Sequence, residues 1–91
     1  MKIIIVPAQG FGDWILINLI IRILSKKYYE IGLVYNSYSI EFIRYMFSDL
    51  LNVKPEIDCQ LDIPNISTIK YYCEQHNCDY INYLLINAIK C

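Results

Sequence analysis

The chain has 91 residues, of which 56% are hydrophobic and 19% are charged, and its net charge is −1 at neutral pH. This length allows one small domain, residues 1–91, and the apolar content excludes a disordered tail. Because lysine and arginine are few and scattered, we expect no nucleic-acid partner and no attraction to an anionic bilayer. A domain this small and apolar leaves hydrophobic surface uncovered, which favours a homodimer or a partner protein.

The start of the chain does not have the pattern of a targeting segment. Its apolar run is short and is broken by Pro7 and two glycines, whereas a secretory signal has a longer apolar core. The later apolar run, residues 14–24, is too short to cross a bilayer and contains Asn18 and Arg22. We therefore expect no membrane span and a cytoplasmic location.

The first three elements are expected to be a strand, a helix and a strand. Residues 2–8 form a continuous apolar, largely β-branched run, as in a buried parallel strand with Pro7 at its end. Residues 13–27 carry their polar side chains on one narrow helical stripe, which predicts a mostly buried helix. Asp13 would cap the start of this helix. Residues 31–35 are the expected second strand.

The middle of the chain continues this alternation. Residues 40–50 place five apolar side chains on one helical face, and Ser39 is the expected N-cap. Residues 52–58 are expected to form a third strand, and Pro55 within them favours a position at the edge of the sheet.

The last third begins with a predicted helix over residues 64–76, on which Ile66, Ile69, Tyr72 and Cys73 align. After it, residues 79–90 fit a helix, while residues 80–86 fit a strand equally well. Periodicity cannot decide between the two for so short an apolar run, and both interpretations stay open.

The junction between the first strand and the first helix is a glycine turn, Gln9-Gly10-Phe11-Gly12-Asp13. Strand, glycine turn and helix in this order predict an α/β fold with a small Rossmann-like parallel sheet, in βαβαβ order with flanking helices. Dinucleotide binding is disfavoured, because Ile15 replaces the third glycine of GxGxxG and Tyr35 stands where a ribose-binding acid is expected. No cofactor is predicted, and a nucleotide-binding Rossmann module is the weakest alternative.

Asp13 allows two interpretations. A carboxylate at this helix start would repel a bound diphosphate, but it could accept a proton from a sugar hydroxyl as a general base. Alternatively, it caps the helix and has no chemical role.

The residues of this junction resemble a known family. Residues 7–13, followed by an apolar helix that ends in Leu-Ser-Lys-Lys-Tyr at residues 24–28, are similar to the N-terminal end of GT-B glycosyltransferases. The resemblance is strongest to heptosyltransferase-like enzymes of family 9 and to related sequences in large DNA viruses. Residues 39–50 resemble the second helix of the viral sequences, so the likeness covers about residues 1–60.

This resemblance implies a function. It makes Asp13 the catalytic base that activates the acceptor hydroxyl, and it assigns acceptor binding to Gln9, Gly10, Phe11 and Gly12. Trp14 stands where many relatives carry a polar residue, so we expect it either to pack in the core or to stack on a sugar. In GT-B enzymes a second Rossmann domain holds the nucleotide sugar, and the chain is incomplete relative to such an enzyme.

The expected function is therefore that of an acceptor-side, glycosyltransferase-like domain. Its ligands would be a sugar acceptor and, through a partner chain with the second domain, a nucleotide sugar. Alone, this domain would be inactive. Together with the second domain it would transfer a hexosyl or heptosyl group. The reaction would take place in the host cytoplasm if the protein is viral. The alternative from another class is a non-catalytic remnant or interaction module that dimerises or docks on a relative.

Two further groups of residues have competing interpretations. Cys73, His76, Cys78 and Cys91 can be drawn as a zinc site, but their spacing matches no common finger or ribbon, and no metal ligand is predicted. The paired and clustered tyrosines would either stack on carbohydrate or half-bury at helix faces and strand ends; they are Tyr28, Tyr29, Tyr71, Tyr72, Tyr80 and Tyr83.

Overall fold

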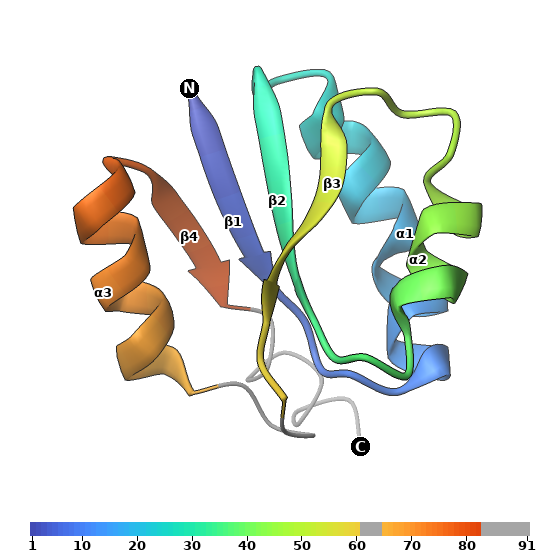
Figure 1. Ribbon diagram of the computed structural model, residues 1–91. Coiled ribbons are helices and arrows are strands. Elements are labelled where there is room, and N and C mark those ends of the chain that lie inside the picture. Colours follow the sequence, from blue (N-terminus) through green and yellow to red (C-terminus); the bar gives the residue numbers. More distant parts are fainter. Residues whose placement is uncertain (61–64, 83–91) are drawn as a thin grey trace.

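A computed structural model of the chain describes residues 1–60 and 65–82, which form an α/β fold with an all-parallel sheet (Figure 1). In these residues strands and helices alternate: β1 (Lys2–Val6), α1 (Phe11–Ser25), β2 (Glu30–Tyr35), α2 (Ile40–Met46), β3 (Val53–Asp58), α3 (Ile66–His76) and β4 (Asp79–Asn82). The order across the sheet is β3-β2-β1-β4, and every pair is parallel. The predicted Rossmann-like α/β class is confirmed.

The helices lie on both faces of the sheet, with α1 and α2 on one face and α3 on the other (Figure 1). Successive side chains of a strand point to opposite faces, so a continuous apolar run such as β1 supplies both. Ile3 and Ile5 pack under α1 and α2, whereas Ile4 and Val6 pack under α3. This two-sided burial explains why the first strand shows no polar alternation.

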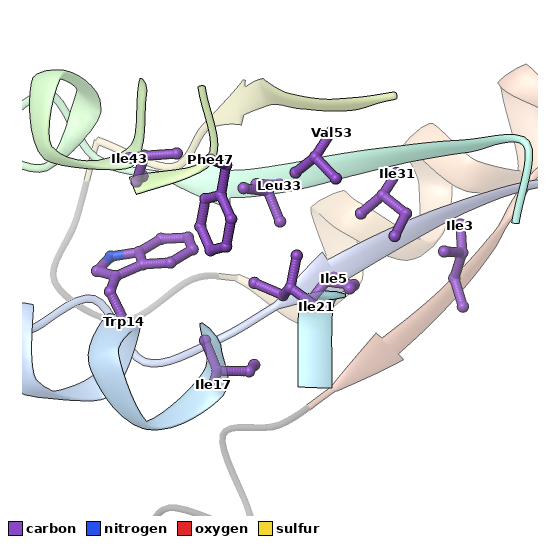
Figure 2. Packing of buried hydrophobic residues seen from close by; sticks show 10 residues of the cluster. All are labelled: Ile3, Ile5, Trp14, Ile17, Ile21, Ile31, Leu33, Ile43, Phe47 and Val53. Atoms are coloured by element: carbon purple, nitrogen blue, oxygen red, sulfur yellow. The ribbon is translucent and has the colours of Figure 1, made fainter. Parts of the chain in front are cut away.

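The core under α1 and α2 is the larger of the two clusters in the described residues. Trp14 is fully buried there, and Figure 2 shows its indole ring beside Ile43 and Phe47. Of the two roles expected for Trp14, the structure supports core packing. The ten buried members of this cluster, all shown in Figure 2, are Ile3, Ile5, Trp14, Ile17, Ile21, Ile31, Leu33, Ile43, Phe47 and Val53.

All three helices in the described residues differ from their predicted bounds. Helix α1 ends at Ser25 rather than at residue 27, and α3 begins at Ile66 rather than at residue 64. Helix α1 begins at Phe11 with Gly10 as its N-cap, so Asp13 is the third helical residue and Gly12 is helical rather than part of a turn. Helix α2 ends at Met46 and continues as a turn, shorter than the predicted 40–50. The apolar pattern starts after the hydrogen-bonded start of α1, and it continues past the end of α2. Helix ends are set by caps and turns rather than by apolar spacing.

Ser39 is the N-cap of α2, as predicted, but its side chain binds no helix N–H. The hydroxyl instead donates to the backbone oxygen of Asn36 at 3.2 Å, and the Ser39 N–H donates to the same oxygen at 3.1 Å. A turn over residues 36–39 therefore leads directly into the helix, and it occupies the hydroxyl that would otherwise cap it.

Strand β3 lies at the edge of the sheet, the position that Pro55 predicted. The pairing of β2 with β3 is irregular: Leu33 pairs with Pro55, whereas Val34 pairs with Ile57. Glu56 is therefore an extra residue on β3, as in a β-bulge. Glu56 points toward the face that α3 covers, where its carboxylate lies beside Gly32, and the shift places Ile57 on the same face.

Strand β4 resolves part of the ambiguity in the last third of the chain. Residues 79–82 pair with residues 3–6 of β1, so the helix predicted over 79–90 is wrong at its start and the strand interpretation is correct for residues 80–82. The remainder of both predictions, residues 83–90, lies outside the described residues. None of the helices described is long and apolar enough to cross a membrane.

Candidate functional site

The glycine loop joins the carboxyl end of β1 to α1 (Figure 1). Strand β1 has β2 on one side and β4 on the other, so the chain leaves β1 at the point where the strand order reverses. Open α/β sheets bind their ligands in the crevice outside the carboxyl ends of the strands at such a switch point. The predicted site residues 9–13 thus lie at the usual ligand-binding position of this fold class.

Gln9 ties this loop to the neighbouring strand. Its side chain is only 8% exposed, and its amide nitrogen donates to the backbone oxygens of Pro7 at 3.0 Å and Val34 at 2.9 Å. Its side-chain oxygen is buried and has no hydrogen-bond partner among the described residues. Gln9 therefore positions the loop backbone from inside, and a ligand on the open surface would meet its neighbours first.

Gly10 and Asp13 form a local pair at the start of α1. The Gly10 N–H donates to Oδ2 of Asp13 at 3.1 Å, which is the carboxylate half of a capping box. A Cβ added to Gly10 would lie 2.9 Å from the same oxygen. The glycine therefore lets the carboxylate approach the backbone. Asp13 caps the helix start from the third helical position, and the N-cap that was expected at Asp13 is Gly10.

Gly12 has no structural reason to be glycine. It is helical and exposed, its φ is not positive, and a Cβ added there would meet no atom within 4 Å. The prediction that both glycines form a sharp turn is therefore wrong for Gly12, which is helical. The missing side chain leaves the outer side of the first turn of α1 open, beside the N–H groups that a helix start leaves unpaired.

Asp13 retains a second oxygen for other contacts. The carboxylate is half-buried, and in the described part of the chain only its Oδ2 is engaged, by Gly10. The loop therefore offers one carboxylate oxygen, helix N–H groups and an uncovered backbone within one turn of helix.

Two cavities lie away from the glycine loop. One of about 380 Å³ opens at the amino ends of β1 and β4, opposite the glycine loop, and is lined by Met1, Lys70, Cys73, Glu74, Asn77, Cys78, Asp79 and Tyr80. Another of about 270 Å³ is lined by Tyr29, Glu30, Leu51, Asn52 and Lys54. Neither of these two cavities includes the loop residues 9–13.

A polar cluster that the sequence did not reveal lies on the face under α3. Oε2 of Glu56 is 2.6 Å from Nζ of Lys2 and accepts a hydrogen bond from the hydroxyl of Tyr72, also at 2.6 Å. Oε2 of Glu30 is 3.6 Å from the same ammonium group. Burial, followed by the hydrogen bond and charge of Glu56, raises the pKa of Tyr72 to about 12. The cluster joins β1, β2, β3 and α3 and holds them in register.

The proposed zinc ligands do not assemble in the described residues. Within residues 1–60 and 65–82, no three His, Cys, Asp or Glu side chains are grouped to hold a metal ion, and Cys91 lies outside this range. His76 is exposed at the end of α3, and its ring stacks on Tyr72 with centroids 4.0 Å apart. The expected position of His76 at a helix end is therefore confirmed.

The tyrosines do not form one stacking surface. Tyr28 packs against the core under α1 and α2, whereas Tyr72 and Tyr80 pack against the core on the opposite face of the sheet. Tyr29 and Tyr71 are exposed, and Tyr83 lies outside the described residues. The half-buried interpretation is thus correct for three of the predicted six.

Comparison with known proteins finds no matching family model, no similar curated protein and no similar solved structure. The fold and the loop place the chain in the class of small Rossmann-like α/β domains.

Proposed function

We propose that this chain is the acceptor-side domain of a GT-B-like glycosyltransferase, with Asp13 as the general base. The observation that carries the proposal is the position of Asp13: its carboxylate lies at the switch point of the sheet, with one oxygen engaged by Gly10 and the other facing no partner among the described residues. The resemblance of residues 7–13 to heptosyltransferase-like enzymes supports the same role.

The loop residues have separable roles in this proposal. Gly12 leaves space for a sugar to approach the first turn of α1, and Gly10 allows Asp13 to fold back against the backbone. Gln9 fixes the loop to β2 through Val34. The acceptor hydroxyl would donate to Asp13, which takes its proton as the oxygen attacks the anomeric carbon. The bond from that carbon to the phosphate oxygen of the nucleotide breaks at the same time, and the nucleotide leaves with the bonding electrons. General-base catalysis of this kind contributes about 10²–10⁴ in rate. A second domain or a partner chain supplies the nucleotide sugar.

Saturation-transfer NMR with a panel of monosaccharides and nucleotide sugars tests this proposal. We expect a monosaccharide signal from the wild-type chain that weakens in Asp13→Asn, a change that removes the negative charge but keeps the size of the side chain. Asp49→Asn is the matched control, because Asp49 follows α2 and pairs with Arg22 away from the loop. Silence across the panel from a folded wild-type chain, or equal weakening by both variants, would refute the acceptor site.

The alternative, a non-catalytic interaction module, is favoured by one specific observation. At 3.6 residues per turn, positions 15, 16, 19 and 23 fall on one face of α1. Their side chains are 62%, 60%, 66% and 49% exposed, namely Ile15, Leu16, Leu19 and Ile23. An apolar helix face of this kind marks an interaction surface, and we propose a second copy of the chain as its occupant in this alternative.

The oligomeric state distinguishes this alternative. Light scattering after size exclusion should show a dimer that Leu19→Glu converts to a monomer. Leu51→Glu is the control, because Leu51 is 91% exposed but lies in the turn before β3. A wild-type monomer at high concentration, or a dimer that survives Leu19→Glu, rejects this surface.

A further inference from the structure

Two cysteines meet at the end of α3. Helix α3 terminates in Asn77, which adopts the left-handed conformation with φ 52° and ψ 50°. The chain then folds back, and the N–H of Cys78 donates to the backbone oxygen of Cys73 at 3.1 Å. This is the six-to-one hydrogen bond of a Schellman motif, in which the residue after the left-handed position contacts the last turn of the helix.

The same motif brings the two thiols together. Cys73 and Cys78 occupy the two positions whose side chains meet in a Schellman ending, and both line the same cavity. The Cys73 thiol donates to the backbone oxygen of Asp79 at 3.9 Å. A disulfide needs Cα atoms about 4.4–6.8 Å apart, and a direct backbone hydrogen bond between the two residues imposes a separation of that order. Both cysteines are free thiols in the structure.

The two thiols differ in access. Cys73 is 4% exposed, and burial is the main cause that raises its pKa to about 12. Cys78 is half-buried, and both cysteines line the cavity of about 380 Å³ at the amino ends of β1 and β4. An incoming molecule would therefore reach Cys78 first, and the protected thiol of Cys73 would act second.

The cavity has the size and charge for a small peptide-like molecule. Its volume lies within the roughly 300–1,000 Å³ of ligand pockets, and its lining combines cationic Lys70 with anionic Glu74 and Asp79. Charges of both signs fit a zwitterion such as a glutathione unit. Cys59, by contrast, follows β3 at the carboxyl edge of the sheet and does not line this cavity.

We propose that Cys73 and Cys78 form a dithiol modification site, which a low-molecular-weight peptide disulfide such as oxidised glutathione enters through the cavity and converts to an intramolecular disulfide. This inference does not depend on the glycosyltransferase proposal, because the site lies at the opposite edge of the sheet.

The reaction proceeds in two exchange steps. The Cys78 sulfur, after losing its proton to solvent, attacks one sulfur of glutathione disulfide, and the other glutathione leaves as a thiolate. The Cys73 sulfur then loses its proton and attacks Sγ of Cys78, which forms the protein disulfide and expels the second glutathione. The two protein thiols lose two electrons in total, and the glutathione disulfide gains them to become two thiols.

The experiment equilibrates the native chain with reduced and oxidised glutathione, followed by acid quenching, alkylation and peptide mass mapping. We expect a disulfide between Cys73 and Cys78 in the wild type and equally in Cys59→Ser. In Cys73→Ser, glutathione should accumulate on Cys78, because the second step is missing. The same titration in urea measures the equilibrium constant for disulfide formation in the unfolded chain, where the Schellman turn is absent. We expect this constant to be roughly tenfold or more higher in the native chain than in urea.

Other results would overturn the proposal. These are an equilibrium constant no higher in the native chain than in urea, stable glutathione adducts on Cys78 of the wild type, or pairing of Cys78 with Cys91 in the mapped peptides. The comparison of native and urea-unfolded wild type remains decisive even where a cysteine variant fails to fold.

Discussion

Gly32 provides the sharpest test of the packing described above. It lies in the middle of β2, on the face covered by α3, and a Cβ added there would lie 2.7 Å from Cδ1 of Ile4 and 2.8 Å from Oε1 of Glu56. Neither neighbour can move freely, because Ile4 is fully buried and Glu56 is held by Lys2 and Tyr72. Gly32→Ala must therefore displace a core side chain, or the carboxylate at the centre of the polar cluster.

The expected cost can be worked out from two opposing effects. Inserting a methyl group into a packed site costs about 1–3 kcal/mol, and replacing glycine by alanine returns about 0.4–1 kcal/mol by restricting the unfolded chain. We expect Gly32→Ala to lower the free energy of unfolding by about 1–2 kcal/mol. For a domain of this size that corresponds to a loss of about 5–15 °C in Tm.

Urea unfolding monitored by the fluorescence of Trp14, the single tryptophan, measures this change. The control is Gly12→Ala, which adds the same methyl group in a helix where no atom lies within 4 Å. There alanine is the better helix former, and we expect a gain of up to about 1 kcal/mol. Equal effects in the two variants, or a stabilised Gly32→Ala, would show that the sheet face at Gly32 is not packed as described.

Three further predictions concern other elements. Asn65→Ala removes the N-cap of α3, whose side-chain oxygen accepts from Ser67 at 3.0 Å, and should lower the free energy of unfolding by about 0.5–2 kcal/mol in a urea titration, whereas Asn65→Asp should retain most of it. Ile21→Val, at a fully buried position, should cost about 0.5–1.5 kcal/mol, whereas Ile15→Val on the exposed face should leave the unfolding midpoint unchanged. The pKa of Tyr72, raised to about 12, means that the folded state holds its proton more tightly than the unfolded state, so its contribution to stability is complete below about pH 10 and is lost as the pH rises towards 12. Unfolding free energies at pH 9 and 11 should accordingly fall more steeply for the wild type than for Tyr72→Phe, and parallel slopes would contradict the raised pKa.

The order of elements could be predicted because it depends on local patterns. The two-sided apolar run of β1 and the helical periodicity of α1 are each visible within about 15 residues. Pro55 placed β3 at the edge, since a proline removes a ladder donor. The start of α1 and the end of α2 were less predictable, because they depend on the backbone at Gly10 and Phe47 rather than on apolar spacing.

The candidate site was predictable in position but not in geometry. Strand, glycine and helix in sequence locate the loop at the carboxyl edge, whereas the hydrogen bond of Asp13 to Gly10 depends on where the helix begins. The Glu56 cluster was missed for a different reason. Its members are far apart in the chain, and only the folding of β1, β3 and α3 brings Lys2, Glu56 and Tyr72 together.

The irregular pairing of β3 also affects how this molecule behaves in a crowded solution. An edge strand exposes unpaired N–H and C=O groups that invite another chain to add a strand, which is a common start of aggregation. In β3, Pro55 has no N–H to donate, and the regular pairing of β3 with β2 is interrupted immediately after Pro55. A regular row of donors and acceptors is therefore missing on this side, which disfavours edge-to-edge pairing with a further strand.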